Sequence, residues 1–174
     1  MCNSFPEFGL VSMGEILKET LEFLKKNIPD ILPLSLKILH PLTLPPHSYN
    51  PRRKQYLSPA FLHWIKENYP GESVLGITDK DLYVPGLNFV FGQAELRGRV
   101  GVVSLARLRG KDDQREEIFL TRILKESVHE LGHILGLRHC PNTLCVMSFS
   151  NSLYDVDRKR EILCGRCSHL LGLG

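Results

Sequence analysis

The segment HELGHILGLRH, residues 129–139, restricts the fold of this 174-residue chain more than any other feature. On an α-helix, residues four positions apart share a face, so the side chains of His129 and His133 project together. His139 would lie about 15 Å beyond His129 along the axis if the helix continued. Gly136 is placed to allow a reversal, because glycine adopts positive φ at little steric cost. We therefore predict that the chain reverses at Gly136 and that the three imidazoles converge.

Three convergent histidines are typical of a catalytic zinc site, which keeps a fourth position for water. Glu130 lies about 100° around the helix from His129, so its carboxylate can face that water without binding the metal. Zinc lowers the pKa of its water to about 7, and a positioned carboxylate can act as general base. We expect His129, His133 and His139 to bind zinc, Glu130 to be the base, and amide hydrolysis to be the reaction. The alternative is a surface helix that carries histidines by chance, which the glycine and third histidine at fixed offsets make much rarer.

Four of the five cysteines also have metal-ligand spacing: C-x4-C and C-x2-C, at Cys140, Cys145, Cys164 and Cys167. This pattern fits a closed, tetrahedral structural zinc site. Two disulfides are the alternative, but they fit poorly with a chain expected in a reducing compartment. We expect the fifth cysteine, Cys2, to be a free thiol.

Composition favours one domain over residues 1–174, with a sheet-containing part over about 1–135 and a cysteine-rich part over about 136–174. The formal net charge of +3 is too small to indicate a nucleic-acid or anionic-membrane partner. The basic runs at 52–54 and 158–160 are expected to be solvated surface. No stretch approaches the roughly 20 apolar residues of a membrane span, and no secretory signal is recognisable. We expect a cytoplasmic protein.

Hydrophobic periodicity predicts an α/β chain whose longest helix carries the histidine motif. Strands are expected over 8–12, 34–39, 73–78, 88–91 and 100–105, and helices over 14–27, 59–68 and 115–135. The proline-rich segment 40–59 is expected to be an irregular surface loop.

Taken with Cys140, Cys145, Met147 and the later C-x2-C, the helix motif resembles the archaemetzincins, of the metzincin clan of zinc peptidases. The resemblance is specific over the second half of the chain; the first half matches only in element order. It implies an α/β (α+β) fold, with a metzincin-like twisted mixed β-sheet of about five strands and long helices. It also implies two zinc ions, one catalytic and one structural, and a peptide or protein substrate. The antiparallel edge strand of that fold lines the cleft, and 88–91 is its best candidate here.

In this family Met147 would be the Met-turn residue beneath the metal, although a core methionine is the simpler interpretation. Phe149 and Tyr154 either wall the substrate pocket or serve only packing. The leading hypothesis is a monomeric zinc metallopeptidase, with endopeptidase or aminopeptidase action undetermined. The alternative is a zinc-stabilised peptide-binding protein with little or no proteolytic activity. A zinc-ribbon nucleic-acid module is a third possibility, which the small net charge opposes.

Overall fold

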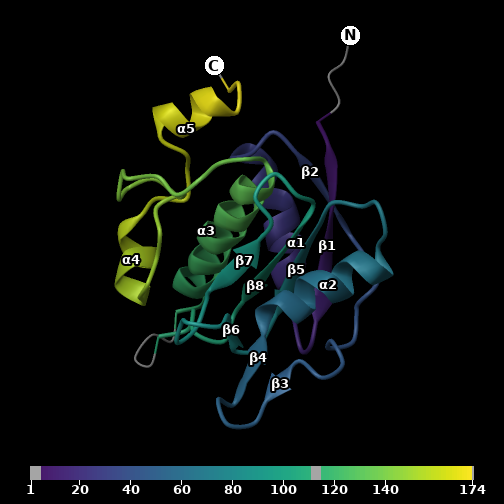
Figure 1. The fold of residues 1–174 in the computed structure, drawn as a ribbon. Helices are drawn as coiled ribbons and strands as arrows, with labels where there is room; N and C mark the ends of the chain where they lie inside the picture. Colours follow the sequence, from purple (N-terminus) through teal and green to yellow (C-terminus); the bar gives the residue numbers. More distant parts are fainter. Residues whose placement is uncertain (1–4, 111–114, 174) are drawn as a thin grey trace.

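A mixed five-stranded sheet forms the centre of the molecule in the computed structural model, which describes residues 5–110 and 115–173 (Figure 1). The strand order is β2-β1-β5-β8-β7. The first four of these are mutually parallel, and β7 runs antiparallel to β8 at one edge. In chain order the strands are β1 (Glu7–Met13), β2 (Ser35–Ile38), β5 (Val74–Thr78), β7 (Gly92–Ala94) and β8 (Val100–Ser104). The expected α/β fold with about five strands is confirmed.

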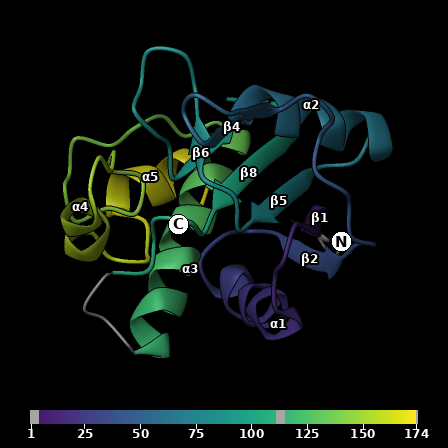
Figure 2. The same ribbon diagram turned by 90° about the horizontal axis from the view of Figure 1, so that it is seen from below.

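Helices cover both faces of this sheet, as Figure 2 shows. Helices α1 (Lys18–Asn27) and α3 (Glu116–Ile134) lie on one face, and α2 (Ser58–Asn68) lies on the other. A 3-10 turn, η1 (Ile28–Asp30), which begins with Ile28 and Pro29, follows α1. Two short helices, α4 (Leu153–Arg158) and α5 (Gly165–Leu170), complete the chain beside α3.

The inner strands are apolar on both faces because helices cover both sides. Every residue of β5 and β8 is buried. Alternate side chains enter two separate cores: Val103 packs with the α1 and α3 side, and Val102 packs with the α2 side. The period-2 alternation of a strand therefore divides one apolar run between two layers. This arrangement fixes α3 against the sheet and so places the histidine motif.

The prediction of a strand over 88–91 was wrong. The antiparallel edge strand is β7, and Val90 makes only an isolated bridge to Leu82. The apolar run Phe89–Phe91 has the composition of a strand, but pairing with β8 decides the register. A turn over Glu95–Gly98 returns the chain so that Gly92 pairs with Val103.

The segment 40–59 is also more regular than predicted. It contains β3 (Tyr49–Asn50) and β4 (Gln55–Leu57), which join β6 (Leu82–Tyr83) in a second sheet of order β3-β4-β6. Strands of two or three residues leave no periodicity in the sequence, and β4 depends on a partner from a later part of the chain.

Two further expectations concern the ends and surface of the molecule. No helix in the described parts of the chain has the length and apolar character needed to cross a membrane. Cys2 lies outside the described residues.

Candidate metal centre

The helix that carries the first two histidines ends as predicted. Gly136 has φ +104°, its N–H donates to the carbonyl of His133 at 2.9 Å, and the N–H of Leu137 donates to the carbonyl of Gly132 at 2.8 Å. These two bonds make a Schellman motif, in which a left-handed residue satisfies the last carbonyls of a helix. The chain then reverses and returns His139 toward the helix.

The three imidazole rings converge. Ring centroids lie 4.6 Å apart for His129 and His133, 5.3 Å for His129 and His139, and 4.9 Å for His133 and His139. One ring nitrogen from each lies within 4.8 Å of the other two. His129 is buried, whereas His139 is exposed at the mouth of the site. Burial, reinforced by the positive charge of Lys159, holds the pKa of His129 well below its ordinary value, which favours the neutral, metal-binding form.

The hydrogen bonds of the rings show which nitrogens are free. Nδ1 of His129 lies 2.9 Å from the carbonyl oxygen of Val146, and Nδ1 of His133 lies 2.7 Å from that of Leu137. A carbonyl only accepts, so each Nδ1 carries the proton and each Nε2 presents a lone pair. The two Nε2 atoms nevertheless lie 3.1 Å apart. Two lone pairs at that distance repel unless a cation lies between them. Two ligands at 2.0–2.1 Å from a tetrahedral zinc are separated by about 3.3 Å, so the site fits this ion.

The carboxylate of Glu130 lies in the same site and approaches the edge strand β7 at Gly92. Glu130 is 4% exposed, and burial, with a further contribution from Glu126, raises its pKa well above the ordinary value. A Cβ atom added to Gly92 would lie 2.6 Å from Oε1 of Glu130. The edge strand β7 therefore lies so close to the carboxylate that a residue with a Cβ atom would not fit at position 92.

A cleft of about 580 Å³ opens onto these side chains. Residues 84 and 86–94 form one wall, Phe149, Ser150 and Asn151 form the other, and the histidines and Glu130 lie between them. The Phe149 ring centroid is 5.2 Å from that of His139. Tyr154 is 70% exposed and does not line the cleft. Of the two aromatic residues left open by the sequence, only Phe149 belongs to the pocket wall.

Three successive carbonyls attach the segment Val146–Ser148 to its surroundings. That of Val146 accepts from the His129 ring, and that of Met147 accepts the N–H of Cys140 at 2.9 Å. The carbonyl of Ser148 lies 3.3 Å from the ammonium of Lys159. The Met147 side chain is fully buried in the main core, and a Cβ on Gly132 would lie 2.4 Å from its sulfur. Met147 thus packs directly against the histidine-bearing helix.

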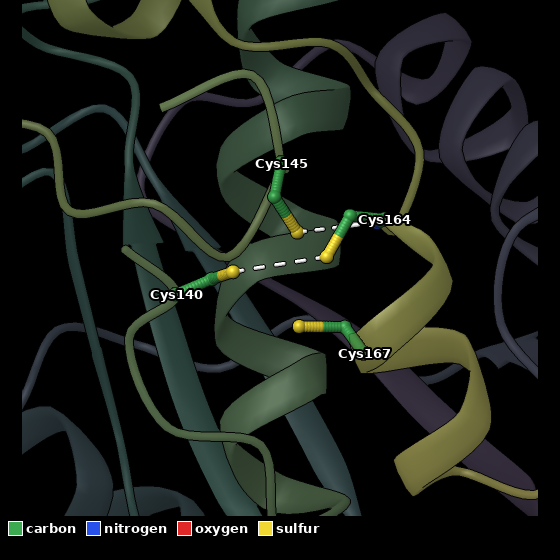
Figure 3. A group of neighbouring side chains, drawn as sticks. All are labelled: Cys140, Cys145, Cys164 and Cys167. Carbon is green, nitrogen blue, oxygen red and sulfur yellow. Dashed lines mark hydrogen bonds between the residues drawn. The ribbon is translucent and has the colours of Figure 1, made fainter. Parts of the chain in front are cut away.

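The four C-terminal cysteines form a second cluster (Figure 3). All four are free thiols, and their sulfurs lie within 4.8 Å of one another, so the disulfide alternative does not describe this structure. Sγ of Cys140 and Sγ of Cys164 are 3.7 Å apart. Tetrahedral zinc with bonds of 2.3 Å would place two sulfurs about 3.8 Å apart, so this cluster also fits the ion. A hydrogen bond from the backbone of Cys167 is the main cause that lowers the pKa of Cys164 to about 7, which favours the thiolate.

Sequence reasoning missed four residues around the site. Glu126 lines the cleft, and the ammonium of Lys159 lies 2.8 Å from its carboxylate. Gly92 borders Glu130, and the N–H of Arg97 donates to the carbonyl of His133 at 3.0 Å. Glu126 had one available signal, since it precedes Glu130 by one helical turn. Lys159 had been expected on a solvated surface, and that prediction is wrong, because Lys159 is only 1% exposed.

The sequence model described as Peptidase family M54 matches residues 35–172. This match and the geometry of the site together define the class: the protein is a zinc metallopeptidase, a hydrolase. The chain belongs to this family, and its resemblance to the archaemetzincins is confirmed.

Known relatives cover most of the chain. The archaemetzincin of Methanopyrus kandleri is 54% identical over 130 residues, which is 74% of this chain and 72% of the relative. The crystal structure of archaemetzincin from the same organism superposes with a TM-score of 0.89 at 41% identity, covering 99% of this chain and 96% of that one. The zinc-dependent peptidase of Methanocorpusculum labreanum superposes with a TM-score of 0.80 at 26% identity, covering 94% and 100%.

Proposed function

We propose that this chain hydrolyses peptide bonds at a zinc ion held by His129, His133 and His139, with Glu130 as general base. One observation carries the proposal: two Nε2 atoms face each other at 3.1 Å while both Nδ1 atoms are committed to carbonyls. Such an arrangement favours a cation between the two nitrogens. A buried carboxylate on the next residue of the helix supplies the base that hydrolysis requires.

Zinc, when bound, would acidify a water molecule and polarise the carbonyl of the scissile bond. The protein's own residues then handle the proton. Glu130 would accept it from the attacking water and return it to the leaving amine. The carbonyls of Val146 and Leu137 keep the two helix imidazoles in the correct tautomer and orientation.

The substrate is proposed to lie along β7. Within the described part of the chain β7 pairs on one side only, with β8, and its residues Gly92, Gln93 and Ala94 line the cleft. An extended peptide can add to such an edge through main-chain hydrogen bonds, with its side chains alternating between the two faces. We therefore assign the substrate-pairing role expected for 88–91 to Gly92–Ala94.

A second zinc on Cys140, Cys145, Cys164 and Cys167 is proposed to be structural. Cys140 follows His139 directly, so this metal would fix the backbone that carries the third catalytic ligand. Replacing Cys164 and Cys167 with serine tests both points. Zinc content should fall from two ions per chain, and the remaining site should release zinc more readily. A remaining site that binds zinc as tightly as in the wild type would contradict the support of His139.

Glu130→Gln tests the hydrolytic proposal. Peptide-library digestion by the wild type should be lost in the variant, while zinc content and thermal stability remain, because Glu130 is not a ligand. Peptide binding without cleavage that depends on Glu130 would instead favour a zinc-stabilised binding protein. Salt-sensitive retention on nucleic acid would favour the third possibility.

A further inference from the structure

A fully buried lysine lies close to the metal centre. The side chain of Lys159 has no exposed surface, and its Nζ atom lies 2.8 Å from Oε1 of Glu126, whose side chain is 3% exposed. Transferring an ammonium and a carboxylate out of water is costly, and such a pair rarely stabilises a fold more than apolar residues of similar size would. A buried ion pair beside a catalytic centre therefore calls for an explanation other than stability.

The position of the pair suggests that explanation. Glu126 is on α3, one turn before His129, and lines the cleft. Lys159 follows α4 and approaches α3 from the side of the Val146–Ser148 segment. Besides the carboxylate, its ammonium contacts the carbonyl of Ser148 at 3.3 Å. Lys159 is thus a bridge between the histidine-bearing helix and this segment.

The bridged segment sets the orientation of a metal ligand. The carbonyl of Val146, two residues before Ser148, accepts the hydrogen bond from Nδ1 of His129 at 2.9 Å. If Ser148 moved away from α3, the Val146 carbonyl would move with it, and the imidazole would lose the partner that fixes its tautomer and direction. Groups that hydrogen-bond to metal ligands typically change metal affinity or activity by about 10- to 100-fold when they are lost.

We propose that Lys159 is a positioning residue of the catalytic centre: its ammonium joins Glu126 to the Ser148 carbonyl and so holds Val146–Ser148 where Val146 orients the His129 ring. The inference rests on the proposed function in one respect, that His129 binds the catalytic metal. Lys159 itself contacts neither the metal-binding nitrogens nor the cleft.

Neighbouring contacts provide a matched control. The guanidinium of Arg122, also on α3, makes two hydrogen bonds to Asp157 at 2.7 and 2.8 Å. This second bridge joins the same helix to the end of α4, but Asp157 has no bond to Val146–Ser148 among those of the described residues. Asp157→Asn therefore weakens attachment of the same elements without the contact proposed to matter.

The test compares wild type, Lys159→Met and Asp157→Asn by zinc affinity, using competition with a chromophoric chelator. We expect Lys159→Met to weaken the histidine site by about 10- to 100-fold. Asp157→Asn should leave that affinity unchanged even if it lowers thermal stability. In the metal-free protein, the Nδ1–H of His129 should give a protected imidazole resonance in the wild type that is lost in Lys159→Met. Equal zinc affinities for wild type and Lys159→Met would overturn the proposal.

Lys159→Met leaves the Glu126 charge unpaired, so a double variant guards against loss of folding. Glu126→Gln with Lys159→Met removes both charges of this pair and still lacks the bond to Ser148. We expect it to fold and to keep the weakened zinc affinity. Recovery of wild-type affinity would show that only charge compensation matters and would refute positioning. If the wild type cleaves no peptide, the proposed function fails, whereas these metal and resonance measurements still decide the role of Lys159.

Discussion

Replacing Gly92 with alanine would test whether the position of the Glu130 carboxylate controls hydrolysis. An added Cβ would lie 2.6 Å from Oε1 of Glu130, 2.8 Å from its Cγ, and 2.8 Å from the backbone oxygen of Val102. Ordinary contact begins at 3.4 Å, so the carboxylate would have to retreat by about 0.8 Å. The Val102 oxygen belongs to the backbone of the sheet, so β7 would also have to shift slightly, and Glu130 is too buried to turn freely into solvent.

A displacement near 1 Å in a catalytic group costs about 100-fold in rate. We therefore expect Gly92→Ala to lower kcat by about 100-fold, equivalent to roughly 2.7 kcal/mol of activation free energy. Zinc content should not change, because Glu130 is not among the ligands. KM should change less than kcat, since β7 keeps its main-chain groups for the substrate.

Gly101→Ala is the matched control for strain in the same hairpin. Its Cβ would lie 3.1 Å from Cβ of Ala94, and the three atoms nearest to it belong to Ala94, Gln93 and Leu75 and not to Glu130. Steady-state kinetics on one peptide, with zinc content measured in parallel, would compare the two variants. A kcat for Gly92→Ala within twofold of the wild type, or an equal loss in Gly101→Ala, would refute the reasoning.

Three further predictions concern the helix. In Gly132→Ala, the Cβ would lie 2.4 Å from the Met147 sulfur, so we expect the unfolding free energy to fall by about 1–3 kcal/mol despite alanine's better helix propensity. A variant that is more stable than the wild type in urea unfolding would contradict this packing. Gly136→Ala places a side chain at φ +104° and should cost about 1–2 kcal/mol, visible as a lower unfolding midpoint together with weaker zinc binding; an unchanged midpoint would argue against a required left-handed residue. The third concerns pH: burial raises the pKa of Glu130 above its ordinary 4.5, so its stabilising contribution is present at acid pH and is lost as pH rises. Metal-free Glu130→Gln should therefore gain stability relative to metal-free wild type as pH rises above 4.5, and parallel pH profiles of urea unfolding would contradict this.

The sequence predicted the metal centre better than it predicted the cleft. His129, His133 and Gly136 are related by helical spacing and by the conformational preference of glycine, both of which are local. The cleft depends instead on which strand is the edge. The run Phe89–Phe91 looked like that strand, but pairing with β8 assigned the edge to Gly92–Ala94.

The burial of single charged residues also could not be predicted from the sequence. Lys159 stands between two arginines in a run that local reasoning assigns to solvent, yet it is buried and pairs with Glu126 of α3. Its partner Glu126 lies 33 positions earlier, and nothing in the spacing links the two. The short strands β3 and β4 were missed for a similar reason, since β6 is needed to hold them.

What the sequence determined by itself was a helix that presents two imidazoles, a glycine that ends it, and two sets of residues with metal-ligand spacing. These follow from interactions within a few residues, where backbone geometry leaves few choices. Tertiary structure decided which carbonyls orient the imidazoles, how closely Gly92 approaches Glu130, and that Lys159 is buried. Those features depend on segments distant in the chain that come into contact only when the sheet and α3 bury their apolar faces together. The local spacing of residues does not predict such contacts.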